Sequence, residues 1–205
     1  MTNLKDHKSG KWAKDENFPV ASFLISPEHR TAMKAFYRFA RSADDAADNS
    51  TMKPSEKLHL LDKLEATLLG YSDDAKDAVP LRKIYHERGL STKHAQDLLV
   101  AFRQDVTKKR YETWDELLNY CSYSANPVGR FILDIHGEHQ STYKYSDTLC
   151  TTLQIINHLQ DCKKDYHQLD RIYIPLNEFR NQNIDVQELS KNNSSLVLLK
   201  IFNNT

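Results

Sequence analysis

Apolar side chains recur every three to four residues along most of the chain, and helix-capping residues divide this pattern into segments. Ser26, Pro27 and Glu28 supply a cap, a proline suited to the first helical position and an acid in the first turn, which predicts a helix to about residue 49. Similar signals predict helices over about 55–70, 72–89 with a break at Pro80, 91–109, 113–137 with a kink at Pro127, and 147–169. The pattern indicates an all-α protein.

The chain after residue 169 departs from this helical pattern. Residues 171–175 read RIYIP, and their β-branched side chains, together with the restriction before proline, favour an extended segment. The last fifteen residues combine an Asn/Ser-rich stretch with a short apolar tail, and their secondary structure is left open.

Composition agrees with a single helical domain. The 205 residues divided by ~150 per domain give about 1.4, and the low count of five glycines and six prolines argues against a β-sandwich, collagen or a disordered chain. No apolar run approaches the ~20 residues of a transmembrane helix, and the first residues lack the apolar centre of a secretory signal. With Cys121, Cys150 and Cys162 expected as reduced thiols, we predict a cytoplasmic protein.

The charge balance argues against nucleic acid as a partner. Lys and Arg together number 28, as do Asp and Glu, so the chain lacks the basic excess typical of nucleic-acid-binding domains. Glycine-rich phosphate-binding loops do not occur in the sequence either. Any chemistry on a phosphate is therefore expected to depend on a metal ion.

The first predicted helix carries an acidic cluster on one face. A strip roughly 100° wide begins apolar and aromatic and becomes acidic over its last two turns. The strip contains Met33, Tyr37, Ala40, Arg41, Asp44 and Asp48, with Asp45 at its edge. Buried carboxylates need a compensating cation, and the acidity left over after Arg41 suits Mg2+. A solvated acidic face is the alternative, because Asp73, Asp74 and Asp77 repeat the spacing among polar residues.

The last predicted helix carries a second polar cluster. Within about 100° of arc it presents Gln154, Asn157, His158, Asp161 and Asp165. This strip holds no Lys, Glu or Arg, the residues that usually dominate solvated faces, although an amphipathic helix facing water remains the alternative. If the two clusters face each other, they form a binuclear or trinuclear Mg2+ site suited to a diphosphate.

Four segments, in order, resemble those of the squalene/phytoene synthase family. They are ENFPVASFLI, AFYRFARSADDAAD, YCSYSANPVGR and QIINHLQDCKKDYHQLDRIYIP, and they cover about residues 16–175. The first and third look most similar to the bacterial hydroxysqualene synthase branch. The resemblance implies an all-α isoprenoid-synthase bundle around a central apolar cavity, formed by residues 1–205 as one domain. It also implies that further C-terminal helices are missing, which would leave an apolar face exposed.

The resemblance implies roles for individual residues. Mg2+ ligands are implied at Asp44, Asp45, Asp48, Asp161 and Asp165. Substrate contacts are implied for Ser22, Tyr37, Arg41, Gln154, Asn157 and Arg171, and apolar cavity walls for Phe36, Tyr37 and Phe131. Arg41 and Tyr120 would act in catalysis, Arg41 on the diphosphate and Tyr120 by steering the cation or a proton. One position departs from the family, because Asp170 stands where glycine is usual before the Arg171 segment.

The reaction implied is Mg2+-dependent conversion of presqualene diphosphate to hydroxysqualene with release of diphosphate, without NADPH. Two alternatives stay open: head-to-head condensation of two farnesyl diphosphates to presqualene diphosphate or squalene, and a helical protein that binds partners or lipid diphosphates without turnover. Because the product would be insoluble in water, contact with the inner membrane surface is expected; the sequence says nothing of the oligomeric state.

Overall fold

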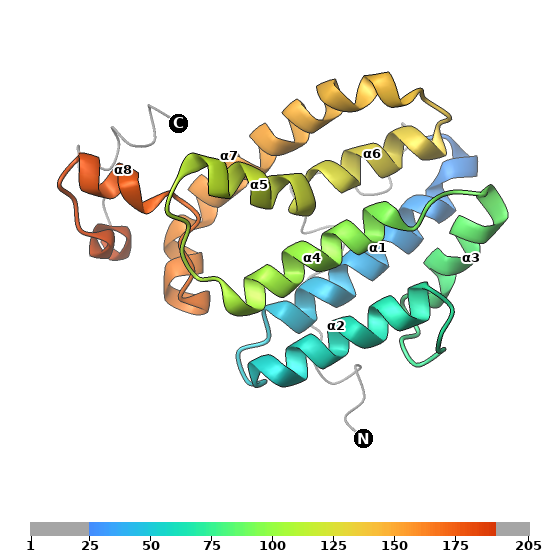
Figure 1. Cartoon of the computed structure of the whole chain (residues 1–205), viewed down its shortest axis with the longest axis horizontal. Coiled ribbons are helices and arrows are strands. Elements are labelled where there is room, and N and C mark those ends of the chain that lie inside the picture. Colours follow the sequence, from blue (N-terminus) through green and yellow to red (C-terminus); the bar gives the residue numbers. More distant parts are fainter. Residues whose placement is uncertain (1–24, 192–205) are drawn as a thin grey trace.

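The protein is a bundle of helices (Figure 1), seen in a computed structural model that describes residues 25–191. The α-helices are α1 (Pro27–Ala47), α2 (Pro54–Leu68), α3 (Val79–Arg88), α4 (Lys93–Thr107), α5 (Trp114–Ser124), α6 (Asn126–Ile135), α7 (Tyr143–Leu169) and α8 (Leu176–Asn181). Two 3-10 turns, η2 (Gln140–Thr142) and η3 (Val186–Ser190), complete the described part. The prediction of an all-α protein is confirmed for these residues.

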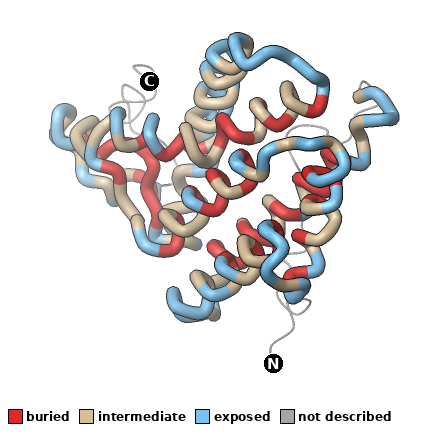
Figure 2. Tube along the Cα trace, turned by 45° about the vertical axis from the view of Figure 1, so that its right-hand side comes forward, coloured by how far each residue is buried: buried red, intermediate tan, exposed pale blue. Residues whose placement is uncertain are grey.

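Helix α4 lies at the centre of the bundle. It packs against α1 and α2 on one side and against α5 and α6 on the other. Large apolar side chains such as Phe39, Leu64 and Leu99 are fully buried between these helices, and Figure 2 shows the buried positions on their inward sides. Removing each such side chain from water contributes roughly 1.5–3 kcal/mol, so the apolar stripes of the sequence account for this packing.

Helix α7 is the longest element and packs along α6 and α5. Its approach to α6 requires Gly129, because a Cβ atom there would collide with Ser146 and Cys150. The outward side of α7 carries a row of exposed apolar side chains. The row consists of Tyr145, Leu149, Leu153 and Ile156. This row leaves an apolar strip of α7 exposed in the described part of the chain.

The extended segment predicted over residues 171–175 is present and joins distant parts of the chain. The Ile172 N–H donates to the Lys109 carbonyl at 2.9 Å, and the Leu176 N–H donates to the Tyr111 carbonyl at 2.9 Å. At its start Asp170 adopts a left-handed conformation with φ 51°. This backbone aims the next side chain, Arg171, into the interior, where it is 3% exposed.

Several predicted helix boundaries were wrong. Pro80 lies in the first turn of α3 and does not break a longer helix, because a helix tolerates proline where no N–H partner is needed. The stretch predicted as one kinked helix is two, α5 and α6, divided at Ala125 next to Pro127. Helix α2 begins at Pro54, and α7 begins before Asp147 at Tyr143. Helix α4 begins at Lys93, whose N–H donates to the Ser91 hydroxyl at 3.2 Å. The short helix α8 and the turn η3 were not predicted.

Two expectations from composition can be compared with the described residues. The cysteines Cys121, Cys150 and Cys162 are all free thiols there. Between residues 25 and 191, no helix has both the length and the apolar character needed to cross a membrane.

Candidate active site

A single cavity of about 840 Å³ brings together the residues that the sequence singled out. Its volume falls in the ~300–1,000 Å³ range of small-molecule sites. One part of its wall is apolar and includes Met33, Phe36, Ala40, Phe102 and Val128. Along α1 the wall changes from these apolar side chains to the aspartates near the end of the helix. The cavity thus joins an apolar compartment to an acidic one.

The first acidic cluster lies on α1 and is partly neutralised by arginines. Arg41 pairs with Asp44 at 2.9 Å and with Asp45 at 2.9 Å, so it compensates two carboxylates and not one. Asp48 pairs with Arg171 at 3.1 Å, across the cavity wall from the extended segment. All three aspartates line the cavity, as does Tyr37.

The second cluster, on α7, lines the same cavity. Gln154, Asn157, Asp161 and Asp165 all contribute to its wall. Burial, the neighbouring Asp161 and, to a smaller extent, the charge of Asp48 together raise the pKa of Asp165 to about 6, against the opposing effect of Arg171. The two clusters therefore share one electrostatic environment, as the hypothesis of a joint site requires. Of the metal-binding, substrate-binding and catalytic residues implied by the resemblance, Ser22 lies outside the described part of the chain, and the others line the cavity.

The acidic end of the cavity holds more negative charge than its arginines offset. Burial and the neighbouring Asp48 raise the pKa of Asp44 to about 7, against the opposing effect of Arg41. Asp44 and Asp165 also lie near the C-terminal ends of α1 and α7, where the helix dipole is negative and carboxylates are disfavoured. Because 37% of the Asp44 side chain is still accessible along the cavity wall, its oxygens can receive a cation.

This arrangement fits an Mg2+ ion that is coordinated jointly by the protein and the substrate. Over residues 25–191, no three His, Cys, Asp or Glu side chains gather closely enough to hold a metal ion by themselves. Mg2+ characteristically takes one or two carboxylates and completes its shell with water and phosphate oxygens. Asp44 or Asp48 on α1 and Asp161 or Asp165 on α7 supply hard oxygen donors of this kind on both helices.

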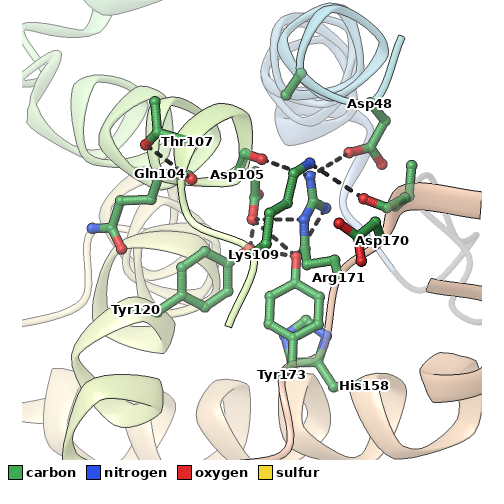
Figure 3. Close-up of polar contacts among 12 residues, drawn as sticks. Asp48, Gln104, Asp105, Thr107, Lys109, Tyr120, His158, Asp170, Arg171 and Tyr173 are labelled. Carbon is green, nitrogen blue, oxygen red and sulfur yellow. Dashed lines mark hydrogen bonds and ion pairs between the residues drawn. The ribbon is translucent and has the colours of Figure 1, made fainter. Parts of the chain in front are cut away.

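A buried polar network lies beside the acidic end of the cavity (Figure 3). Asp105 of α4 accepts hydrogen bonds from the hydroxyls of Tyr120 and Tyr173, both at 2.9 Å. Arg171 donates to the Tyr173 hydroxyl at 3.1 Å and to the Asp105 carbonyl at 2.9 Å. Through Arg171 the network is connected to Asp48.

His158 completes this network as a neutral ring. It stacks on Tyr173 with ring centroids 3.5 Å apart, and its Nε2 lies 3.1 Å from the Gln154 amide nitrogen. Burial, reinforced by Arg171, lowers the pKa of His158 to about 3. The ring is therefore uncharged near neutral pH and serves as a packed wall with one polar edge.

Two residues of this site were missed by reading the sequence for clusters. Asp105 is not part of an acidic cluster in the sequence, and Tyr173 is not part of a polar cluster. A signal for Asp105 exists, because it shares the helical face of Leu98 and Ala101, both buried. An acid on an apolar helix face is costly unless it is hydrogen-bonded, so this position predicts a buried network.

Two expectations about the cavity wall are corrected or set apart. Phe131 does not line the cavity; it is fully buried behind Phe36 and stacks on it with centroids 4.1 Å apart. Asp73, Asp74 and Asp77 lie between α2 and α3 and take no part in the cavity, and Asp73 pairs with Arg82. The aspartate spacing acquires meaning only from the fold around it.

Comparison with known proteins identifies the family. A model of the squalene/phytoene synthase family matches residues 13–202 of the chain. The chain belongs to this family. Membership makes it a prenyl-diphosphate-dependent synthase.

Several curated relatives share the name hydroxysqualene synthase. The chain is 52% identical over 200 residues to a hydroxysqualene synthase from Rhodopseudomonas palustris and 51% identical to one from Sinorhizobium fredii. Each alignment covers 98% of this chain and 68% of the relative, so the relatives are longer. Among solved structures, squalene synthase HpnC from Alicyclobacillus acidocaldarius matches with a TM-score of 0.78 at 27% identity, over 98% of this chain and 75% of that one. The prediction of an isoprenoid-synthase-type bundle is confirmed.

Proposed function

We propose that this squalene/phytoene synthase family member converts presqualene diphosphate to hydroxysqualene, with release of diphosphate and dependence on Mg2+, in squalene and hopanoid biosynthesis. The observation that carries the proposal is the joining of an apolar compartment to an acidic end within one cavity. A prenyl diphosphate has the same two parts, an apolar chain and a charged head. The identity of about half of all aligned residues to hydroxysqualene synthases favours this member of the family's reactions.

The acidic end would receive the diphosphate. Asp44, Asp48, Asp161 and Asp165 would hold Mg2+ between the two helices, and Asp45 is kept beside them by Arg41. When bound, Mg2+ would neutralise the charge that develops on the leaving diphosphate.

The protein's own cations and amides would orient the substrate. Arg41 and Arg171 are held in place by the aspartates, so their positive charges would meet the phosphate oxygens without reorganising. Gln154 and Asn157 lie one to two turns before the second pair of aspartates and would donate to the same group. Tyr37 lines the cavity one turn before Arg41 and completes this end.

The apolar compartment would protect the carbocation left after ionisation. Phe36, Phe102 and Val128 keep water away from this region, and an aromatic face attracts a cation through its quadrupole. Tyr120 stands where the apolar wall meets the buried polar network, so it is placed to act on the cation or on a captured water. No NADPH is expected, since the carbocation would be captured by water and not reduced by hydride.

Condensation of two farnesyl diphosphates to presqualene diphosphate or squalene is the second candidate. The similar solved structure bears the name squalene synthase, which favours this reaction. Both reactions use the same acidic end and differ in the allylic substrate and in the fate of the cation.

Incubation of the purified chain with Mg2+ and with each diphosphate in turn separates the candidates. We expect diphosphate release and hydroxysqualene from presqualene diphosphate, measured by a phosphate assay and by mass spectrometry of the extracted lipids. Release from farnesyl diphosphate with a C30 product would favour the second candidate. Release from neither substrate would contradict both and leave a binding protein.

A further inference from the structure

Asp105 is the buried carboxylate of the cavity wall that belongs to neither acidic cluster. It is 4% exposed, and each of its two carboxylate oxygens accepts a tyrosine hydroxyl, Oδ2 from Tyr120 and Oδ1 from Tyr173. Asp105 also lines the cavity, but both of its carboxylate oxygens are hydrogen-bonded to these hydroxyls. We therefore expect Asp105 to act on a ligand through the tyrosines.

Counting hydrogens shows that the two tyrosines are not equivalent. Each hydroxyl has one hydrogen, and both hydrogens are directed at Asp105. The Tyr173 oxygen also accepts from Arg171 at 3.1 Å, so a proton arriving there would lie beside a guanidinium. The Tyr120 oxygen lies 3.3 Å from that of Tyr173, a contact that uses at most one of its two lone pairs. Tyr120 thus keeps acceptor capacity, and its hydroxyl is already bonded to a carboxylate.

Tyr120 also has the right surroundings for this capacity to matter. The cavity wall to which it contributes also contains Phe102, Ser124 and Val128, which are apolar or uncharged. Among the described residues that line the cavity, the remaining carboxylates lie in the two acidic clusters, where Mg2+ and diphosphate are proposed to bind. A route from the apolar compartment to a carboxylate that avoids this end therefore runs through Tyr120.

We propose that Asp105, acting through Tyr120, receives the proton released when water captures the carbocation. This inference rests on the proposed function, since only a water-terminated reaction produces such a proton. It assigns Asp105 the part of a positioning residue and final proton acceptor, and it places Tyr120 in contact with the attacking water.

The step balances without a further reactant. A lone pair of the water oxygen forms the new C–O bond, and one water proton passes to the Tyr120 oxygen as the tyrosine's own hydroxyl proton passes to Oδ2 of Asp105. The alcohol, a neutral tyrosine and a neutral carboxylic acid result. Asp105 returns to the carboxylate when it gives this proton to solvent after the product leaves.

The ionisation properties of the two groups agree with this order of transfer. Burial raises the pKa of Asp105 to about 6, against the effect of Arg171, so the carboxylate is a stronger base than an ordinary aspartate yet remains ionised at neutral pH. Burial and the charge of Asp105 raise the pKa of Tyr120 well above its usual value, so the phenol passes a proton on and does not itself stay ionised.

The test compares two conservative variants with the wild-type protein, each assayed with presqualene diphosphate. Asp105→Asn removes the proton acceptor, and Tyr120→Phe removes the connecting hydroxyl. Two quantities are followed separately: the rate of diphosphate release, which reports ionisation, and the hydroxysqualene fraction of the C30 products. We expect this fraction to fall on the order of tenfold or more, with elimination products in its place, while diphosphate release changes much less.

Asp97→Asn is the matched control. Asp97 is also a buried aspartate of α4, 8% exposed, but it pairs with Lys93 and does not line the cavity. This variant should keep the wild-type product ratio. Circular dichroism verifies that each variant folds, and if Asp105→Asn does not fold, Tyr120→Phe decides the question alone because it retains the ring.

Failures of the two proposals look different. If the wild-type protein forms hydroxysqualene and both variants keep the same product ratio, the relay is overturned and the proposed function stands. Equal losses of diphosphate release and of alcohol, with no new product, would also overturn the relay, because they indicate a structural role. If the wild-type protein forms no hydroxysqualene, the proposed function fails and the relay with it.

Discussion

At the scale of single residues, the aspartates of the two clusters should be separable from aspartates that share only their spacing. Asp44→Asn or Asp161→Asn removes an oxygen charge from the cavity wall, so we expect turnover to fall on the order of 100-fold or more, with little change in the folded structure. Asp74→Asn alters an exposed aspartate of the same sequence spacing and should change turnover very little. Steady-state rates and thermal unfolding of the three variants provide the comparison. Equal losses in all three would contradict the assignment.

The crowded carboxylates also predict how Mg2+ and pH act together on stability. The pKa values of Asp44, about 7, and Asp165, about 6, lie above the ordinary 3.8, so the folded state holds protons that the unfolded state releases. Without metal, these two groups should therefore lower stability as pH rises from about 4 to about 7. Mg2+ binds the deprotonated carboxylates, so it should stabilise more at pH 7.5 than at pH 5.

Thermal unfolding with and without Mg2+ at the two pH values measures this effect. At tenfold the dissociation constant, linkage gives about 1.4 kcal/mol, which corresponds to a rise of about 3–6 °C in the midpoint for a chain of this size. The same shift at both pH values, or none, would show that these carboxylates do not bind the ion.

The residues of the site differ in how far sequence reasoning could reach them. Asp44, Asp48, Asp161 and Asp165 recur at helical spacing, so their sharing of a face followed from the 3.6-residue period. That the two faces line one cavity required the packing of α1 and α7 around α4 and α5. Asp105 stands alone in the sequence, and its importance comes from two tyrosines distant along the chain. The apolar face of α4 marks Asp105 as a buried acid, but no local pattern identifies the tyrosines that bond to it.

At the scale of elements, the end of α7 determines where Arg171 points. Asp170 occupies the left-handed region with φ 51°, a backbone conformation that favours glycine. Asp170→Gly removes this strain but also the Arg110–Asp170 ion pair, so the free energy of unfolding should change by less than about 1 kcal/mol. Asp170→Val places a β-branched residue there and should cost about 1–2 kcal/mol. A change in the backbone conformation of residue 170 would also displace Arg171 and weaken its ion pair with Asp48. The valine variant should therefore also lose turnover.

Urea unfolding of the two variants, with parallel assays, tests this reasoning. A valine variant as stable and as active as the glycine variant would show that the conformation of residue 170 does not position Arg171.

Helix interiors were easier to predict than helix ends for a physical reason. The apolar period of α1 or α4 extends over three or more turns, and each turn adds to the same signal. The ends depend on single residues that are compatible with more than one structure. Pro80 can break a helix or lie in its first turn, and in the folded protein it lies in the first turn of α3. Helix α7 begins at Tyr143, where the Tyr143 hydroxyl donates to Asp134 of α6, a contact invisible in the local sequence.

At the scale of the whole molecule, α7 has two faces with opposite surroundings. Its polar face closes the cavity, whereas Tyr145, Leu149, Leu153 and Ile156 form a row in contact with solvent. Single exposed apolar residues are common on proteins, but a contiguous row on one helix binds apolar dyes and promotes association. The row therefore predicts behaviour in solution that the core does not.

Replacing Leu149 and Leu153 together by Gln should remove much of this apolar surface at little cost. Because the two side chains are 60% and 51% exposed, the free energy of unfolding should change by less than about 1 kcal/mol. Leu64→Ala in the fully buried interface between the helices should instead cost about 2–5 kcal/mol. We expect the double variant to bind less of the dye ANS and to sediment as a smaller species than the wild-type protein at high concentration. Destabilisation of the double variant comparable to that of Leu64→Ala would mean that this face of α7 is covered in solution. The prediction of a solvent-exposed apolar row would then be wrong.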